Sequence, residues 1–321
     1  MKRTFVLAPA FVIIGAWILG CCDPDPDPEP PVAIGEKHIF HTIVNGDQRE
    51  YIVYIPSHYN PANSYPIVFQ LHGGTGNGEK FYRISGWNDL AEAHGFLVAY
   101  PTSWAYDLNS NGCGNRPVTS WNDFELIDEV CPAEVLRDDV AFISQMIDEI
   151  DGNFSIDTNR VYISGFSNGG GMTSRLSIEL SNRIAAVGIM AGSLPGDTTA
   201  TFTPARILPI HVMIGTVDDK VGEVTSFPNG LPMDLPAVIA EPHINNLLTT
   251  WATAFDLNMN YIITDSIGSV ITAQFNGNSG APDHLLRFSL LENVGHAFPN
   301  PPNRPGAADI FWQFFEPYSL H

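Results

Sequence analysis

Residues 165–169, with the sequence Gly-Phe-Ser-Asn-Gly, constrain the fold of this chain more than any other segment. Residues 160–164 before them alternate and include β-branched and aromatic side chains, which predicts a strand. Glycines then open residues 172–180, whose apolar side chains suit a helix. A strand that turns sharply into a helix through G-x-S-x-G is the arrangement of a nucleophile elbow. We therefore predict that the Ser167 hydroxyl is exposed at the carboxyl end of a sheet strand.

The spacing of the two glycines has a steric reason. A serine in such a turn has unusual backbone angles, so the residues two positions away must lack a bulky Cβ, and Gly165 and Gly169 meet that requirement. The helix that begins there directs its free N–H groups and its positive dipole end at developing negative charge, which acyl transfer requires. The pattern also arises by chance in a chain with 28 glycines, so the hypothesis depends on partner residues.

Strand and helix patterns alternate along most of the chain. This alternation, over 321 residues, indicates one α/β domain with a mostly parallel central sheet and helices on both faces. An antiparallel hairpin is predicted at the start, where residues 37–44 and 50–55 flank a loop that begins with Asn-Gly. The other main predicted strands are 66–71, 96–100, 160–164, 185–190, 209–214, 261–264 and 285–291, and the main predicted helices are 87–94, 140–150, 172–180, 244–255 and 308–315.

The first residues predict export. Lys2 and Arg3 precede an apolar run that is too short to span a membrane readily as a helix. Two basic residues followed by a short apolar run are typical of a secretory signal. The end of this run, Ile-Leu-Gly-Cys21, resembles the lipobox of bacterial lipoproteins, in which cleavage precedes the cysteine and the thiol receives a lipid. An ordinary signal peptide that ends in Cys is the alternative. We predict a lipoprotein signal at 1–20, lipidation of Cys21, and a location in the cell envelope, at the cell surface or outside the cell.

An acidic, proline-rich stretch follows the predicted signal. Proline blocks helix formation and like charges repel, so residues 21–35 are predicted to form an extended tether ahead of a single domain at 36–321. The formal net charge of the chain is −20. Nucleic acid and anionic membrane surfaces are therefore not expected partners, and the predicted membrane contact is through the N-terminal lipid only.

Two more cysteines, Cys113 and Cys131, lie in a stretch rich in Gly, Asn, Asp and Pro. In an exported protein, one such pair predicts a disulfide that pins the loop, with two free thiols as the alternative. The sequence contains no C-x-x-C motif and no Cys/His cluster, so we predict no metal site.

A serine nucleophile needs a base to take its proton and an acid to orient that base. In the elbow fold both follow the serine, from loops at the carboxyl ends of later strands. Asp218 and Asp219 follow the predicted strand 209–214; we favour Asp218, which opens a D-x-x-V spacing, although periodicity leaves both open and a plain polar turn is the alternative. His296 follows the predicted strand 285–291 in a glycine-containing loop and is the predicted general base.

A glycine-rich loop follows the predicted strand 66–71. Its backbone N–H groups have little side chain in the way and can bind an oxyanion. We predict one donor from Gly74 or Thr75 and a second from Asn168, the residue after the nucleophile. His72 begins the loop and is expected to brace it rather than to act as the base.

Seven ordered motifs together resemble the secreted polyhydroxybutyrate depolymerase and feruloyl esterase family. The resemblance covers about residues 48–315. G-x-S-x-G alone is shared by many hydrolases, whereas the ordered set is far more specific. The motifs are Leu71-His72-Gly73-Gly74, Tyr100-Pro101, Ser120-Trp121-Asn122, Asp138-Asp139-Val140, Gly165-Phe166-Ser167-Asn168-Gly169-Gly170, Gly215-Thr216-Val217-Asp218-Asp219-Lys220-Val221 and Gly295-His296-Ala297-Phe298-Pro299.

The resemblance implies an α/β-hydrolase fold, no metal or organic cofactor, and Ser167, Asp218 and His296 as the triad of a serine esterase. Feruloyl or acetyl esters on plant polysaccharide are the leading expected substrates, and hydroxyalkanoate polyester is second. By the same likeness Trp121 lies beside the substrate, with a core aromatic as the alternative. His72 is a second candidate for contact with the substrate.

Two other functions remain open. A peptidase of the prolyl oligopeptidase kind shares the elbow and the triad order, but it usually carries a propeller domain that 321 residues would not accommodate. A surface protein that binds polysaccharide without turning it over is the other alternative. Such a protein would not need a complete set of nucleophile, acid and base.

Overall fold

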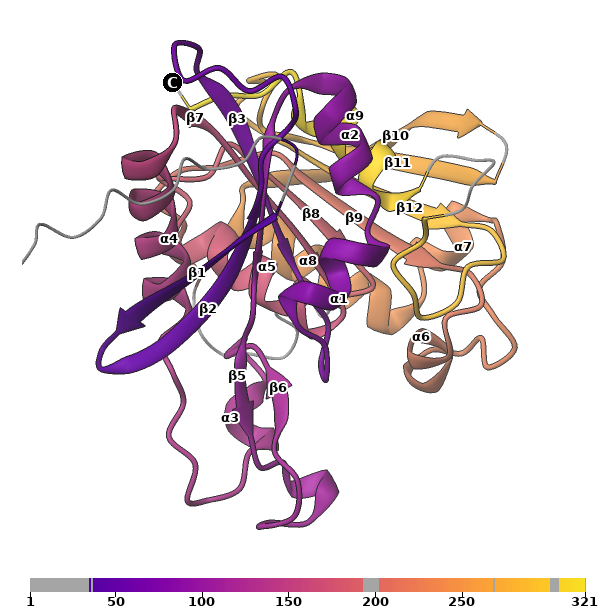
Figure 1. Ribbon diagram of the computed structural model, residues 1–321. Helices are drawn as coiled ribbons and strands as arrows, with labels where there is room; N and C mark the ends of the chain where they lie inside the picture. Colours follow the sequence, from indigo (N-terminus) through magenta and orange to yellow (C-terminus); the bar gives the residue numbers. More distant parts are fainter. Residues whose placement is uncertain (1–34, 36, 193–201, 268, 301–305, 321) are drawn as a thin grey trace, which may run out of the picture. The chain divides into compact units, whose positions relative to one another are not determined.

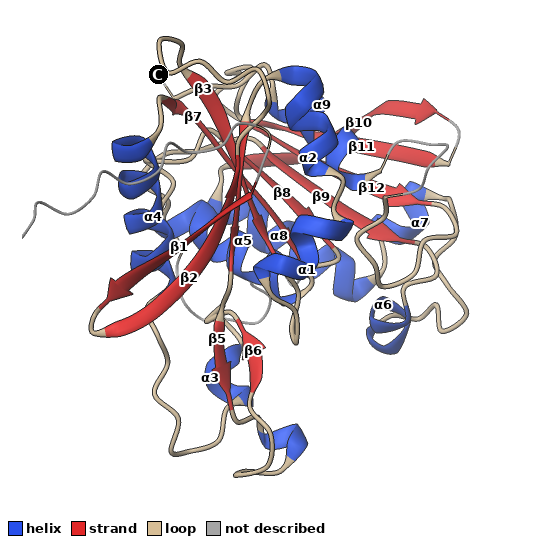
Figure 2. Cartoon of the chain, viewed as in Figure 1, coloured by secondary structure: helices blue, strands red, loops and turns tan. Residues whose placement is uncertain are grey.

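The computed structural model describes residues 35, 37–192, 202–267, 269–300 and 306–320 (Figures 1 and 2). Contacts between residues gather Ala33–His321 into one compact unit. The predicted signal, Cys21 and all of the predicted tether except Gly35 lie outside the described residues. Within the described ranges, no helix is long and apolar enough to cross a membrane.

Ten strands in the described part of the chain form one mixed sheet. In order across the sheet they are β1 (Lys37–Val44), β2 (Asp47–Tyr54), β4 (Leu97–Pro101), β3 (Tyr65–Leu71), β7 (Ile156–Phe166), β8 (Ala186–Met190), β9 (Ile210–Gly215), β12 (Leu285–Leu291), β11 (Val270–Gly277) and β10 (Leu257–Ile267). The strands from β4 to β12 run parallel, and an antiparallel pair continues the sheet at each edge. The predicted α/β fold with a mostly parallel sheet is confirmed.

The amino-terminal hairpin is tighter than the sequence predicted. β1 and β2 pair as far as Val44 with Asp47, so the loop has only two residues, Asn45 and Gly46. Their φ angles are 52° and 93°. A two-residue type I′ turn requires positive φ at both positions, and Asn-Gly meets this requirement with little strain. The residues predicted as the rest of the loop belong to β2.

Helices cover both faces of the sheet (Figure 1). They are α1 (Gly78–Ile84), α2 (Trp87–His94), α4 (Asp139–Asn153), α5 (Asn168–Glu179), α6 (Asp219–Val224), α7 (Leu235–Ile239), α8 (Pro242–Ala254) and α9 (Ala307–Phe315). One layer of the core contains Phe142, Leu176 and Trp251 from α4, α5 and α8, and the other contains Trp87 and Phe311 from α2 and α9. Because α5 follows β7 directly and packs against β3, β7 and β8, its N-terminus lies at the carboxyl ends of central strands.

Residues 102–138, here called the insertion, lie between β4 and α4 and stand outside the large sheet (Figure 2). They contain β5 (Trp104–Tyr106), a 3-10 turn at Asn109–Asn111, β6 (Val118–Ser120) and α3 (Leu126–Glu129). β5 and β6 form a separate antiparallel pair.

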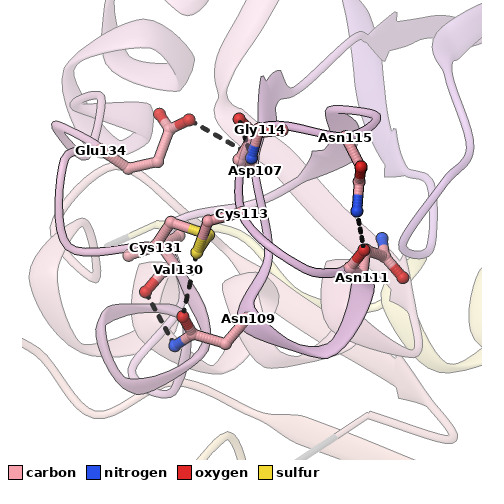
Figure 3. The surroundings of a disulfide bond; sticks show 9 residues. All are labelled: Asp107, Asn109, Asn111, Cys113, Gly114, Asn115, Val130, Cys131 and Glu134. Atoms are coloured by element: carbon pink, nitrogen blue, oxygen red, sulfur yellow. Dashed lines mark hydrogen bonds between the residues drawn. A yellow bond between two sulfur atoms is a disulfide. The ribbon is translucent and has the colours of Figure 1, made fainter.

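A disulfide joins Cys113 and Cys131 within the insertion, as predicted, with Cα atoms 5.8 Å apart. Side-chain hydrogen bonds support the loop around it, including one from Asn109 Nδ2 to the Val130 carbonyl at 2.9 Å (Figure 3). The Cys131 N–H also donates to the Asp107 carbonyl at 2.9 Å. The insertion therefore has a framework of its own around the disulfide, while Trp121 joins the core of the sheet.

Candidate active site

The turn at residues 165–169 has the geometry of a nucleophile elbow. Ser167 lies between β7 and α5 with φ 54° and ψ −124°, a conformation that a residue with a Cβ adopts only where its surroundings enforce it. A Cβ placed on Gly165 would collide with the Gly169 carbonyl, and one on Gly169 would collide with the His72 carbonyl. The glycine spacing is thus a steric requirement of the turn.

Ser167, His296 and Asp218 lie in one hydrogen-bonded chain. His296 Nε2 is 2.9 Å from Ser167 Oγ, and His296 Nδ1 is 3.0 Å from Asp218 Oδ2. Asp218 follows β9 and His296 follows β12, which are neighbours in the sheet. The Asp218 side chain is 0% exposed, while that of His296 is 25% exposed. In this arrangement an imidazole can take the serine proton while the carboxylate stabilises the imidazolium.

The two adjacent acids after β9 differ in environment. Asp218 accepts hydrogen bonds from the N–H groups of Lys220 and Val221 at 2.9 and 3.4 Å, so it caps α6 while it contacts His296. Asp219 is exposed. Burial and capping hold the Asp218 carboxylate in one orientation, and the geometry favours it over Asp219 as the partner of the histidine.

The three predicted oxyanion donors differ in their surroundings. The Thr75 N–H donates to the Thr119 carbonyl at 2.8 Å, so it is already engaged within the protein. Gly74 is a neighbour of Asn168: a Cβ placed on Gly74 would lie 4.0 Å from Asn168 Cβ. Because the Thr75 N–H is engaged, Gly74 is left as the candidate donor from the glycine-rich loop, beside Asn168 at the N-terminus of α5.

Trp121 and His72, the two residues predicted to contact the substrate, are buried in the structure. Both side chains are 0% exposed. His72 Nε2 accepts from the Ser103 N–H at 3.0 Å, and Trp121 Nε1 donates to the His72 carbonyl at 2.8 Å. Burial lowers the pKa of His72 to about 4, so the ring is neutral at neutral pH and keeps its acceptor nitrogen. Both residues brace the glycine-rich loop, as expected for His72, because hydrogen bonds to the backbone occupy their polar atoms.

A pocket of about 480 Å³ opens beside Ser167. Its wall includes the apolar side chains of Ile214, Leu248 and Phe288, the second of which comes from α8. Such a wall suits an apolar group next to the serine. Within the described residues, no group of three or more His, Cys, Asp or Glu is placed to hold a metal ion. The acidic residues of the lining are Asp123, Glu125, Glu129, Asp218 and Glu223.

Comparison with known proteins shows the family to which this chain belongs. The family model described as esterase PHB depolymerase matches residues 49–277. The chain belongs to this esterase family. The range matched to the PHB depolymerase esterases includes Ser167 and Asp218. His296 lies beyond that range, and its association with the other two rests on the distances in the structure.

Alignments with similar proteins cover different fractions of this PHB depolymerase-type esterase. Feruloyl esterase C of Emericella nidulans is 25% identical over 312 residues, 97% of each chain. The bifunctional acetylxylan esterase/xylanase of Neocallimastix patriciarum is 31% identical over 174 residues, 54% of this chain. Poly(3-hydroxyalkanoate) depolymerase C of Paucimonas lemoignei is 36% identical over 134 residues, 41% of this chain. The aligned parts span 22% and 28% of the lengths of these last two proteins.

A solved structure supports the fold. The acetyl xylan esterase of Aspergillus awamori superposes with a TM-score of 0.55 and 16% sequence identity, over 87% of this chain and 99% of that one. At this identity the likeness is one of fold alone. It agrees with the α/β-hydrolase architecture expected of this esterase family.

Asp123 is a pocket residue that the sequence analysis missed. Its side chain is buried, and Asp123 Oδ2 accepts a hydrogen bond from Asn168 Nδ2 at 2.8 Å. Burial raises the pKa of Asp123 to about 6. The one signal in the sequence was that Asp123 directly follows the Ser-Trp-Asn motif. The segment around it is irregular and has no periodic pattern from which the direction of a side chain could be predicted.

Proposed function

We propose that this protein is a serine carboxylic ester hydrolase in which Ser167 is the nucleophile, His296 the general base and Asp218 the acid that orients it. The observation that carries the proposal is the chain of contacts from Ser167 Oγ to His296 Nε2 at 2.9 Å and from His296 Nδ1 to Asp218 Oδ2 at 3.0 Å. Membership of an esterase family supports the same chemistry.

In the proposed reaction, Ser167 Oγ attacks the ester carbonyl while His296 Nε2 takes the serine proton. The N–H groups of Gly74 and Asn168 stabilise the oxyanion that forms. His296 then gives the proton to the leaving alcohol, which leaves an acyl group on the serine. A water molecule, deprotonated by the same imidazole, hydrolyses the acyl-enzyme and returns the serine to its starting form.

We propose feruloyl or acetyl esters of plant polysaccharide as the substrates. The similarity to feruloyl esterase C over 97% of both chains supports this choice, as does the local similarity to an acetylxylan esterase. The apolar wall formed by Ile214, Leu248 and Phe288 suits an aromatic or small acyl group. Hydroxyalkanoate polyester is the second candidate, favoured by the 36% identity to a depolymerase over 134 residues.

We further propose that the protein is exported and held at the cell envelope by a lipid on Cys21. The support comes from the sequence: Lys2 and Arg3, a short apolar run, and Leu-Gly before the cysteine. Metabolic labelling with palmitate tests this proposal, since the wild type should carry the label and Cys21→Ala should not. An unlabelled wild type would contradict it.

Replacement of the nucleophile tests the proposed chemistry. Ser167→Ala should lower kcat for p-nitrophenyl acetate by at least about 10⁴-fold and abolish labelling by a fluorophosphonate probe, because the attacking oxygen is lost. Ser177→Ala is a matched control on the same helix, since that hydroxyl donates only to the Ser174 carbonyl. Activity retained by Ser167→Ala would refute the assignment. Methyl ferulate, acetylated xylan and polyhydroxybutyrate, assayed in parallel, separate the substrate candidates.

A further inference from the structure

Residues 119–123, here called the brace, connect the end of β6 to the loop that follows β3. The Thr119 carbonyl accepts from the Thr75 N–H at 2.8 Å. The Trp121 indole donates to the His72 carbonyl at 2.8 Å. These contacts lie on either side of Gly74 in the chain, so the brace fixes the loop that presents the first candidate oxyanion donor.

The brace also holds the side chain of Asn168, the first residue of α5. Asn168 Oδ1 accepts from the Trp121 N–H at 2.7 Å, and Asn168 Nδ2 donates to the Trp121 carbonyl at 3.1 Å and to Asp123 Oδ2 at 2.8 Å. Both ends of the carboxamide are thus bonded to the brace. The backbone N–H of the same residue is the second candidate oxyanion donor, so the side-chain bonds restrain the position of that peptide group.

Asp123 is surrounded by hydrogen-bond donors. Its Oδ1 accepts from the N–H groups of Glu125 and Leu126 at 3.1 and 3.0 Å, and its Oδ2 accepts from Asn168 Nδ2. Both oxygens are therefore needed as acceptors, which an ionised carboxylate provides. The side chain is 6% exposed. A buried carboxylate destabilises the folded state unless its partners compensate, and here the Asn168 carboxamide is one of three such partners.

We propose that Asp123 is a positioning residue that sets the oxyanion hole through the Asn168 carboxamide. This inference rests on the proposed esterase function. The oxyanion forms only in the transition state, so a loosened Asn168 peptide weakens transition-state stabilisation while substrate binding in the ground state is preserved. Asp123 therefore acts on kcat and leaves KM unchanged.

Asp123→Asn tests the proposal with little change in volume. The substitution places an NH₂ group against one of three donors, so the Asn168 contact or the cap of α3 is lost. We expect kcat for p-nitrophenyl acetate to fall about 10- to 100-fold with KM unchanged, since displacement of a reacting group by about 1 Å can have such an effect. The affinity for a boronic acid that mimics the tetrahedral state should fall in proportion to kcat.

Two further variants separate positioning from folding. Asp123→Ser keeps an acceptor for the N–H groups of Glu125 and Leu126, but its side chain is too short to reach Asn168, so a folded variant should show the same loss of kcat. Asp234→Asn is the control, because this exposed aspartate caps α7 through the Ala237 N–H at 3.2 Å and should leave kcat unchanged.

A double-mutant cycle tests the route through Asn168. If Asp123 acts through that carboxamide, adding Asp123→Asn to Asn168→Ala should lower kcat no further. Losses that multiply in the double variant would overturn the inference, as would full kcat in folded Asp123→Ser, whose side chain cannot reach Asn168. An inactive wild type would instead refute the proposed esterase function.

Discussion

The loop after β9 and the loop after β6 each place one buried aspartate beside the nucleophile elbow. Asp218 accepts two backbone N–H groups at the start of α6 and contacts His296. Asp123 accepts two backbone N–H groups at the start of α3 and contacts Asn168. The two arrangements are similar, because backbone N–H groups near a helix start fix each carboxylate and its remaining acceptor capacity is directed at the site; Asp218 is the N-cap of α6, whereas Asp123 lies two residues before the N-cap of α3.

The two aspartates differ in the partner that they hold. The partner of Asp218 is an imidazole that must move a proton, whereas the partner of Asp123 is an amide that keeps its protons throughout. Removing a carboxylate from an imidazole changes both its orientation and the stability of its charged form. Removing one from an amide changes orientation alone. We therefore expect the loop after β9 to matter more for catalysis than the loop after β6.

The largest expected effect is that of Asp218→Asn. The asparagine cannot stabilise the imidazolium and favours the wrong tautomer of His296, so kcat for p-nitrophenyl acetate should fall about 10⁴-fold. Asp219→Asn is the matched control and should retain the wild-type kcat, because Asp219 is exposed. A loss no larger than that of Asp123→Asn would break the proposed difference between the two loops.

Removal of the disulfide tests how far the brace depends on the rest of the insertion. In Cys113→Ser/Cys131→Ser the free energy of unfolding should fall by about 3 kcal/mol, because a loop with a sequence separation of 18 is no longer closed in the unfolded chain. Urea denaturation with and without reducing agent measures the change, and reductant should affect the wild type only. If Cys113→Ser/Cys131→Ser lost more kcat than Asp123→Asn, the disulfide would position more of the active site than the contact between Asp123 and Asn168 does.

The smallest expected effect is a pH dependence of stability. The folded-state pKa of Asp123 is raised to about 6 by burial from an ordinary value of 3.8, so the folded state binds this proton more tightly than the unfolded state. The contribution of this group to stability is therefore fully present below pH 3.8 and is lost as the pH rises through about 6.

Comparison of two proteins isolates this contribution. Relative to Asp123→Asn, the wild type should lose about 1 to 1.5 kcal/mol of unfolding free energy between pH 5 and pH 8. Urea denaturation of both proteins at the two pH values measures the difference. If the unfolding free energy of the two proteins depended equally on pH, the raised pKa of Asp123 would be contradicted, and with it one feature that distinguishes this residue.

Several elements could be predicted closely from local patterns. The helix predicted at 87–94 coincides with α2, because Gly86 and Gly95 bound it with φ angles of 81° and 75°. β11 was missed. Its residues include Thr272, Ala273 and Gln274, which give no continuous apolar run, and pairing with β10 and β12 on either side decides that it is a strand.

The elbow serine and its two partners could be placed from the sequence because each follows a buried strand within a few residues. In a parallel sheet, loops after neighbouring strands open at the same edge, so order along the chain indicates proximity in space. Sequence alone favoured Asp218 over Asp219 without settling the choice, and it left Gly74 and Thr75 open. Those choices depend on single hydrogen bonds, which only the folded backbone fixes.

The sequence by itself determined most strands of the sheet, the elbow and the candidates for nucleophile, acid and base, because strand patterns and glycine sterics are local. The tertiary structure decided that Trp121 and His72 are buried and support the glycine-rich loop, and that Asp123 contacts Asn168. These side chains belong to an irregular insertion or contact one. The position of such a segment is set by a disulfide and by contacts distant in sequence, which leave no period in the chain.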